Sequence, residues 1–271
     1  MKQRVISAIV AAIIVIPLFL LGGWVFNAGV VALAALAYFE IINLKESHNK
    51  LSNNIRIIGF LCLELIVLSG FDIGFSINGL TNLSIGITIL LLLTPSIFDE
   101  KGKYTTRDAL YLIGFIIFIG LFLNLLVVTR NQPGGQWLLL YLLLIAILTD
   151  TFAYIIGRLI GKHKLIPSVS PKKSIEGCVA GTLMGTIIPV VYYQMVISST
   201  LNIVLVIIMT LVLSILGQLG DLFFSKVKRE NKIKDFSNIM PGHGGILDRV
   251  DSLAFITIGY VVIVNIINLI V

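Results

Sequence analysis

The chain has 271 residues, of which 57% are hydrophobic and 13% charged, with a formal net charge of +6. Soluble globular domains contain about a quarter charged residues. The composition therefore excludes a soluble domain and indicates an integral membrane protein. The apolar runs are continuous rather than alternating, which excludes a β-barrel and predicts membrane-spanning helices of about 20 residues each.

Nine apolar runs are candidate membrane spans, so we expect a single all-α domain, a polytopic bundle of about nine transmembrane helices. Counted from a cytoplasmic N-terminus, nineteen of the twenty Lys and Arg residues fall on the inner side and only Arg130 falls outside. Positive charge in short loops marks the cytoplasmic face, which places the N-terminus in the cytoplasm and the C-terminus outside. The predicted spans are 5–23, 25–43, 57–71, 80–98, 109–129, 136–158, 176–198, 202–226 and 252–271.

Ionisable residues within these spans are candidates for function because burying charge in a membrane is costly. Glu40 and Glu64 lie in the second and third spans, and we favour a structural role for both. Asp150 lies in the sixth span and shares a helical face with Tyr154 and Arg158. We favour a functional role for Asp150, with a buried structural ion pair or a hydrogen-bonded neutral acid as the alternatives.

The loop predicted at 159–175 contains Ser170-Pro-Lys-Lys-Ser174 followed by Glu176. Serine, proline and an early glutamate are typical of a helix start, whose free amides attract anions. Lys172, Lys173 and Ser174 are therefore candidates for phosphate binding. Basic residues that only set membrane topology would explain these lysines equally well.

The eighth span carries a polar stripe at helical spacing. Ser214, Gln218, Asp221 and Ser225 recur at steps of four, three and four, and Lys228 continues the line. Such a stripe can join two helices, but a carboxylate followed by Ser-x-x-Lys-Arg indicates in addition the binding of a charged ligand.

The predicted loop 226–251 is charge-dense. With Ser225 it forms a block of 27 positions that contains six basic residues, four acids, one histidine and a Gly-His-Gly-Gly turn. His243, Gly244 and Gly245 are expected to contact phosphate, because glycine lets backbone amides approach closely. Mg²⁺ prefers one or two carboxylates together with substrate phosphates and water, so Asp221 and Asp248 are the predicted ligands of one or two metal ions.

The block SKVKRENKIKDFSNIMPGHGGILDRVD resembles the C-terminal signature of bacterial phosphatidate cytidylyltransferases, the CDP-diacylglycerol synthases. The runs TDTFAY and SPKKSIEG resemble the upstream motifs of that family, and the order of motifs agrees along essentially the whole chain. Met240 and Ser237 depart mildly from the pattern. The resemblance implies a Mg²⁺-dependent reaction of CTP with phosphatidic acid that gives CDP-diacylglycerol and pyrophosphate, and it implies a homodimer.

The leading hypothesis is a nucleotidyltransferase of the inner (plasma) membrane that acts on its cytoplasmic side, with the catalytic part at about 136–252. A CTP-dependent kinase of a lipid alcohol and a non-enzymatic ion or phosphate carrier are the alternatives. Besides the substrates, membrane lipids are expected partners, and no motif suggests nucleic acid. The predicted catalytic residues are Asp221, Lys228, Arg229, Lys234, Asp235, Asp248 and Arg249. The predicted substrate-binding residues are Asp150, Lys172, Lys173, Ser174, Ser225, His243, Gly244, Gly245 and Asp251.

We also predict where this site lies. Spans six, eight and nine, with the helix start near Ser174, should line a polar cavity in the cytoplasmic half of the bundle. Asp150, Asp221 and Asp248 should converge on it, because the phosphate of a membrane lipid cannot move far from the head-group plane.

Overall fold

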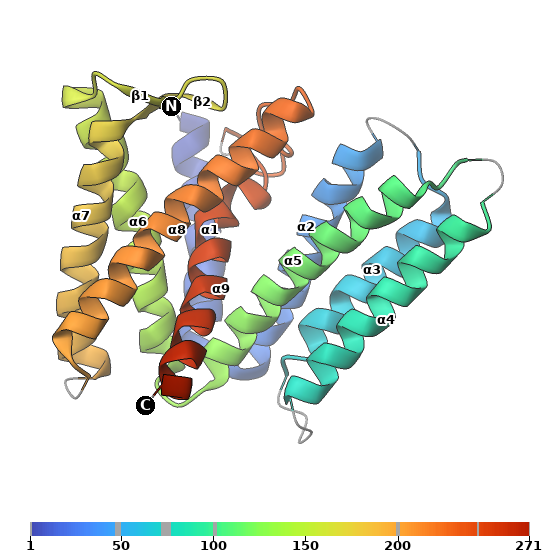
Figure 1. Ribbon diagram of the computed structural model, residues 1–271, viewed down its shortest axis with the longest axis horizontal. Helices are drawn as coiled ribbons and strands as arrows, with labels where there is room; N and C mark the ends of the chain where they lie inside the picture. Colours follow the sequence, from blue (N-terminus) through green and yellow to red (C-terminus); the bar gives the residue numbers. More distant parts are fainter. Residues whose placement is uncertain are drawn as a thin grey trace. The chain divides into compact units, whose positions relative to one another are not determined.

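The structure is a computed structural model that describes residues 2–46, 50–71, 77–99, 102–198, 201–242 and 244–270. These residues are almost entirely helical, which confirms the all-α prediction (Figure 1). The helices are α1 (Lys2–Leu21), α2 (Gly23–Glu46), α3 (Asn53–Leu68), α4 (Ile77–Ile97), α5 (Thr106–Asn131), α6 (Gly135–Ile160), α7 (Ile175–Tyr192), α8 (Ile203–Glu230) and α9 (Leu247–Ile270).

Seven helices in the described part of the chain are long and apolar enough to cross a membrane. They include all of α5 to α9, and α2 and α4 complete the set. The helix α3 has 16 residues, about 24 Å at 1.5 Å per residue, which is shorter than the hydrocarbon core of about 30 Å. Apolar side chains such as Ile208, Ile215 and Leu219 are exposed along α8, as expected for a helix that faces lipid. The protein is therefore an integral membrane protein.

The chain forms two compact units, Met1–Asn131 with Phe236–Leu247, and Gln132–Asp235 with Asp248–Val271. In the first unit α3 packs against α2, α4 and α5. Asn124 of α5 donates from Nδ2 to the Ile66 carbonyl at 2.8 Å and to Ser69 Oγ at 3.1 Å. Lys45 pairs with Asp108 at 2.6 Å, and both side chains are about nine-tenths buried. These polar groups are thus satisfied by partners on neighbouring elements, as a membrane interior requires.

The second unit contains α6 to α9, and small residues let α6 and α7 pack closely (Figure 1). A Cβ atom on Gly177 would lie 2.9 Å from the Gly157 Cα, and one on Gly181 would lie 2.6 Å from the Thr149 carbonyl oxygen. Gly177, Gly181 and Gly185 follow each other every four residues, so they form one glycine face along α7. This is the small-residue spacing by which membrane helices approach each other without a hydrophobic driving force.

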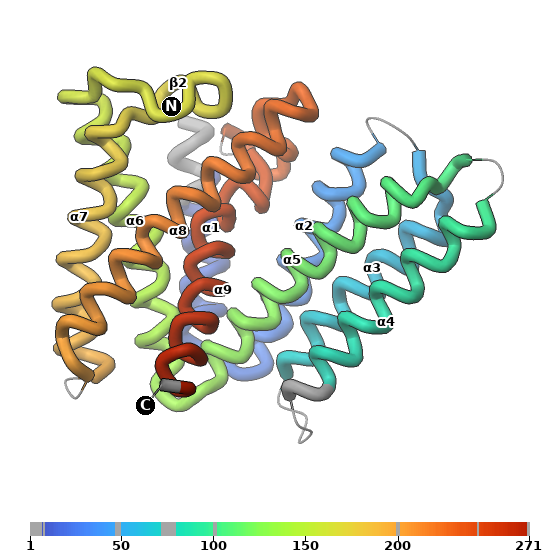
Figure 2. Tube along the Cα trace, in the orientation of Figure 1, coloured from blue at the N-terminus to red at the C-terminus, as the bar shows by residue number. Residues whose placement is uncertain are grey.

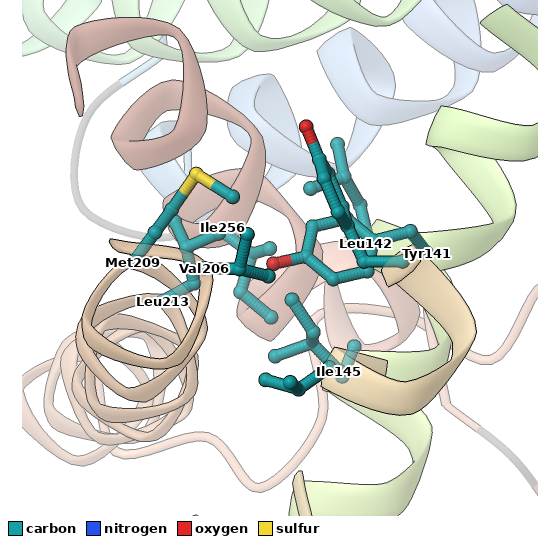
Figure 3. Close-up of a cluster of buried hydrophobic side chains, with 10 residues drawn as sticks. Tyr141, Leu142, Ile145, Val206, Met209, Leu213 and Ile256 are labelled. Atoms are coloured by element: carbon teal, nitrogen blue, oxygen red, sulfur yellow. The ribbon is translucent and has the colours of Figure 1, made fainter. Parts of the chain in front are cut away.

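An apolar core joins α6, α8 and α9 in the second unit (Figure 3). Tyr141 and Ile145 of α6 pack with Leu213 of α8 and Ile256 of α9, and all four are fully buried. The Tyr141 hydroxyl lies 2.7 Å from Thr210 Oγ1, so the polar end of this tyrosine is also paired. This core fixes the three helices that carry half of the predicted site residues.

A short antiparallel hairpin connects α6 to α7, where the sequence predicted a loop (Figure 2). Its strands are β1 (Lys164–Ile166) and β2 (Ser170–Ser174), with Lys164 opposite Ser174. A π-helical turn, Tyr193–Ile197, extends α7.

The helices extend beyond the predicted spans where charged residues begin. The helix α8 continues to Glu230 and α9 starts at Leu247, so both ends of the segment predicted as a loop at 226–251 are helical. An i,i+4 ion pair between Lys226 and Glu230 lies on the extension of α8. Hydrophobicity marks only the part of a helix that lies in lipid, which is why the predicted spans are too short at these ends.

Candidate active site

The polar stripe on α8 has two parts, and the first joins helices. The hydroxyls of Ser214 and Thr149 lie 2.7 Å apart. Gln218 donates from Nε2 to Thr182 Oγ1 at 2.7 Å and to the Cys178 carbonyl at 3.2 Å. These neutral groups hold α8 against α6 and α7, which is the structural alternative that the sequence left open for the stripe.

The second part of the stripe is charged. Asp221 pairs with Lys173 of β2 at 2.6 Å and accepts a hydrogen bond from Ser225 at 3.3 Å. One turn further on, Lys228 pairs with Asp248 of α9 at 2.5 Å. The side chains of this second pair are only 10% and 4% exposed. Two lysine–carboxylate pairs therefore lie two turns apart on one helix face.

Asp150 and Asp251 belong to the same group of charges. Ser252 donates from Oγ to Asp150 Oδ2 at 3.3 Å. Asp150 lies close enough to Asp221, Lys173 and Arg249 for their charges to interact. Asp251 interacts in the same way with Asp150, Asp221 and Lys228. Eight of the residues predicted from sequence are thus brought together, namely Asp150, Lys173, Asp221, Ser225, Lys228, Asp248, Arg249 and Asp251.

Close packing of α8 on α9 makes this convergence possible. A Cβ atom on Gly220 would lie 2.6 Å from the Asp251 carbonyl oxygen, and one on Gly217 would lie 2.8 Å from Ile256 Cδ1. Because neither glycine has a side chain, the carboxylates of Asp221 and Asp251 come within electrostatic range. The glycines that flank the polar stripe thus have a specific steric role.

The segment before α7 forms the predicted helix start. Ser174 caps α7, and its Oγ accepts a hydrogen bond from the Gly177 amide at 3.2 Å. Glu176 in the first turn accepts from the His163 amide at 3.1 Å and lies 2.7 Å from His163 Nδ1. These contacts hold the hairpin on the helix, and they place Lys173 at Asp221 while Lys172 is exposed.

The remaining charged residues predicted for the site lie elsewhere or make other contacts. Arg229 donates from Nε to the Val169 carbonyl at 3.3 Å and from Nη1 to the Ile233 carbonyl at 3.2 Å. Its guanidinium group therefore ties the tip of the hairpin to the end of α8. Lys234 and Asp235 are exposed, and neither forms an ion pair with any described residue.

The glycine-rich turn belongs to the first unit. The backbones of Met240 and Gly244 exchange two hydrogen bonds, of 3.0 and 3.1 Å. Gly242 and Gly244 have φ values of +80° and +83°, which side-chain-bearing residues rarely adopt. His243 lies outside the described residues, so its predicted contact with phosphate stays a prediction.

The sequence predicted a structural role for Glu40 but not its partners. This residue of α2 is fully buried, and its carboxylate accepts hydrogen bonds from Ser237, Ile246 and Leu247, on both sides of the glycine-rich turn. The signal was present in the sequence, because a glutamate within an apolar run needs partners. The partners lie about 200 residues away, and spacing alone does not reveal them.

A separate cavity of about 600 Å³ lies in the first unit. Its wall is apolar and is formed by α1, α2 and the segment from Ile239 to Ile246. The predicted cavity is a polar one on spans six, eight and nine, so this apolar cavity is a different feature and the prediction stays open.

The donor set suits a hard cation. Asp150, Asp221, Asp248 and Asp251 supply carboxylate oxygens, and Mg²⁺ prefers oxygen ligands. Among the described residues, no group of three or more His, Cys, Asp and Glu side chains is arranged to hold a metal by itself. One or two carboxylates completed by phosphate and water remain sufficient for Mg²⁺.

Comparison with known proteins identifies the family. The profile of the cytidylyltransferase family matches residues 2–267. Phosphatidate cytidylyltransferase of Bacillus subtilis (strain 168) is 33% identical over 258 residues, which cover 94% of each chain. The proteins of the same name from Staphylococcus haemolyticus and Staphylococcus saprophyticus are 37% and 38% identical over 256 residues, covering 94% of this chain and 96% of theirs. The chain belongs to the cytidylyltransferase family.

Proposed function

We propose that this protein is a phosphatidate cytidylyltransferase, which converts CTP and phosphatidic acid to CDP-diacylglycerol and pyrophosphate. The observation that carries the proposal is the charge cluster of the second unit, in which Asp221 of α8 pairs with Lys173 of β2 and Asp248 of α9 pairs with Lys228 of α8. The family profile and the names of relatives that align over 94% of the chain support the same reaction.

The reaction is an attack at phosphorus. An oxygen of the lipid phosphate forms a bond to the α-phosphorus of CTP, and the bond from that phosphorus to the bridging oxygen of the β-phosphate breaks, so that pyrophosphate leaves. The second pKa of a phosphate monoester is about 6, so the nucleophile is already ionised at neutral pH. Catalysis therefore needs positioning and charge neutralisation more than a strong base.

The residues of the cluster match these needs. Lys173 and Lys228 are cations held at fixed places by carboxylates and can neutralise phosphate oxygens. The start of α7, directly after Lys173, adds the partial positive charge of a helix N-terminus near the lysines. The acidic side of the cluster consists of the carboxylates of Asp150, Asp221, Asp248 and Asp251, which repel phosphate. Phosphate therefore binds favourably only when the negative charge of these carboxylates is also neutralised.

Mg²⁺ fits this acidic side, and Asp221 and Asp248 would hold it, while Asp150 and Asp251 would support them. When bound, the ion neutralises polyphosphate charge and stabilises the leaving pyrophosphate. One or two ions fit this donor set.

The membrane orientation belongs to the proposal as well. With nineteen of twenty basic residues on the inner side, the N-terminus and the active site face the cytoplasm of the plasma membrane, where CTP is present. The homodimer implied by the resemblance is also part of the proposal, and light scattering of the purified protein would measure it.

The test uses purified protein in detergent with phosphatidic acid, Mg²⁺ and CTP labelled at either the α- or the γ-phosphate. Label from the α-phosphate should enter the lipid fraction, with release of pyrophosphate. Transfer of the γ-label instead would identify a lipid kinase. Transport of phosphate into liposomes without CTP consumption would identify a carrier.

Replacement of Asp221 tests its role in the same assay. Asp221→Asn should lower turnover by about 10²- to 10³-fold, because one preorganised charge is lost. Ser214→Ala, two turns away on the same face of α8, should retain turnover within about threefold, since it removes one helix-joining hydrogen bond. Equal losses in the two variants would contradict the assignment of Asp221.

A further inference from the structure

Glu40 makes an unusual set of contacts for a carboxylate inside a membrane helix. Its exposed fraction is 0%. Oε1 accepts from Ser237 Oγ at 2.6 Å and from the Ile246 amide at 2.7 Å, and Oε2 accepts from the Leu247 amide at 2.9 Å. No Lys, Arg or His among the described residues pairs with it. Both oxygens are therefore directed at a segment that lies about 200 residues further along the chain.

Two of the three donors are backbone amides at the start of a helix. The helix α9 begins at Leu247, so the amides of Ile246 and Leu247 have no acceptor within the helix. A carboxylate at this place satisfies them and interacts favourably with the partial positive charge of the helix end. Glu40, a residue of α2, thus caps α9. The hydrogen bonds of this cap compensate for the cost of burying the charge of Glu40.

The same carboxylate shapes the chain before α9. Ser237 and Ile246 lie on either side of the turn closed by Met240 and Gly244, and both bond to Oε1. A Cβ atom on Gly245 would overlap the Glu40 carboxylate. A glycine is required at this position by close approach to Glu40, independently of any contact with phosphate.

We propose that Glu40 is a positioning residue for the active site, which fixes the Ser237–Leu247 segment and the first turn of α9. Asp248 directly follows the capped Leu247, and Asp251 lies one turn later in the same helix. Loss of the cap frees the first turn and so displaces the carboxylate of Asp248. The proposal rests on the proposed function for its effect on activity, while the cap can be tested without it.

Glu40→Gln is the main variant. Glutamine keeps the shape of the side chain, but its NH₂ group replaces an oxygen that faces an amide or hydroxyl donor. Glu64→Gln is the matched control, because Glu64 is also buried in a membrane helix, at 8% exposed, and neither of its oxygens accepts a hydrogen bond from a described residue. Both variants remove one buried carboxylate, and only one of them affects the cap.

The first measurement is amide hydrogen exchange, which needs no substrate. In Glu40→Gln the amides of Ile246 and Leu247 should exchange at least about tenfold faster, because a charged acceptor is lost. In Glu64→Gln they should exchange as in the parent. Unchanged protection of the two amides in Glu40→Gln would overturn the cap.

The second measurement is cytidylyl transfer as a function of Mg²⁺ concentration. Glu40→Gln should lower activity about 10- to 100-fold, the usual effect of losing a residue that orients a ligand, and should raise the Mg²⁺ concentration for half-maximal activity. Simple destabilisation would reduce the active fraction without moving that concentration. Activity and Mg²⁺ dependence equal to those of Glu64→Gln would overturn the positioning role, even if exchange is faster.

A second variant covers the case in which Glu40→Gln does not fold. Ser237→Ala removes one of three donors and should speed exchange at Ile246 about two- to tenfold, with a smaller shift in the same direction in Mg²⁺ dependence. No change in either property would overturn the proposal. If the parent protein does not transfer cytidylyl groups, the proposed function fails, while the exchange result still decides whether Glu40 caps α9.

Discussion

The buried pair of Lys228 and Asp248 permits a quantitative prediction about stability. Lys228→Met keeps the length of the side chain and leaves Asp248, with a side chain 4% exposed, without its cation at 2.5 Å. Removal of one member of a buried pair costs about 3–5 kcal/mol. The partial positive charge at the start of α9 partly offsets the negative charge of Asp248. We therefore expect a loss of stability at the lower end of this range, about 3 kcal/mol. With an unfolding entropy of about 2.1 cal/mol/K per residue, this loss corresponds for a chain of 271 residues to a melting midpoint lowered by roughly 5 °C.

The control lies two residues earlier on the same helix. Lys226 pairs with Glu230 at 3.4 Å, and both side chains are more than half exposed, so Lys226→Met should cost at most about 0.5 kcal/mol. Thermal unfolding in one detergent at fixed pH, followed by near-UV circular dichroism, compares the two variants. Lys228→Met combined with Asp248→Asn should regain most of the loss, because the buried negative charge that Lys228 balances is removed as well. Equal shifts for the two single variants would refute the reasoning.

Two further predictions concern packing and metal. Gly181→Ala should lower the melting midpoint by an amount that corresponds to about 1–3 kcal/mol, since its Cβ would lie 2.6 Å from the Thr149 carbonyl oxygen. The control is Gly114→Ala, which should not lower the melting midpoint because the space around its Cβ is open. Removal of divalent cations with EDTA should stop pyrophosphate release, and added Mg²⁺ should restore it, because the acidic side of the cluster repels polyphosphate; continued turnover in EDTA would contradict the metal assignment.

Much of the site could be predicted from the sequence because membrane helices make polar residues conspicuous. In an apolar run, Asp150 and Asp221 stand out individually, and helical spacing places Asp221, Ser225 and Lys228 on one face. The contact of Asp221 with Lys173 confirms that the Pro-Lys-Lys-Ser segment reaches this face. Here the cost of charge in lipid limits the number of arrangements, so the pattern is informative.

Other contacts could not be predicted because they depend on tertiary structure. The bonds from Glu40 to Ile246 and Leu247 join helices that are distant in sequence, and no periodicity encodes them. Arg229 was predicted as a catalytic residue, and that role stays a prediction, but the sequence did not show that its guanidinium group donates to the backbone of Val169 and Ile233. An arginine next to a loop has five donors, and the acceptors it finds depend on how that loop folds.

The division of α8 into a neutral and a charged part follows from the cost of charge in lipid. Ser214 and Gln218 form neutral hydrogen bonds to α6 and α7, which are acceptable deep in a membrane. The charged part begins at Asp221, about 14 Å from the end of the helix at Glu230 on a rise of 1.5 Å per residue, where ions are less costly. The bonds of Gln218 lie one turn from Asp221, so the contacts that set the rotation of α8 also set the direction of its carboxylate. In this helix, packing and the position of the reactive charges are therefore determined by the same polar stripe.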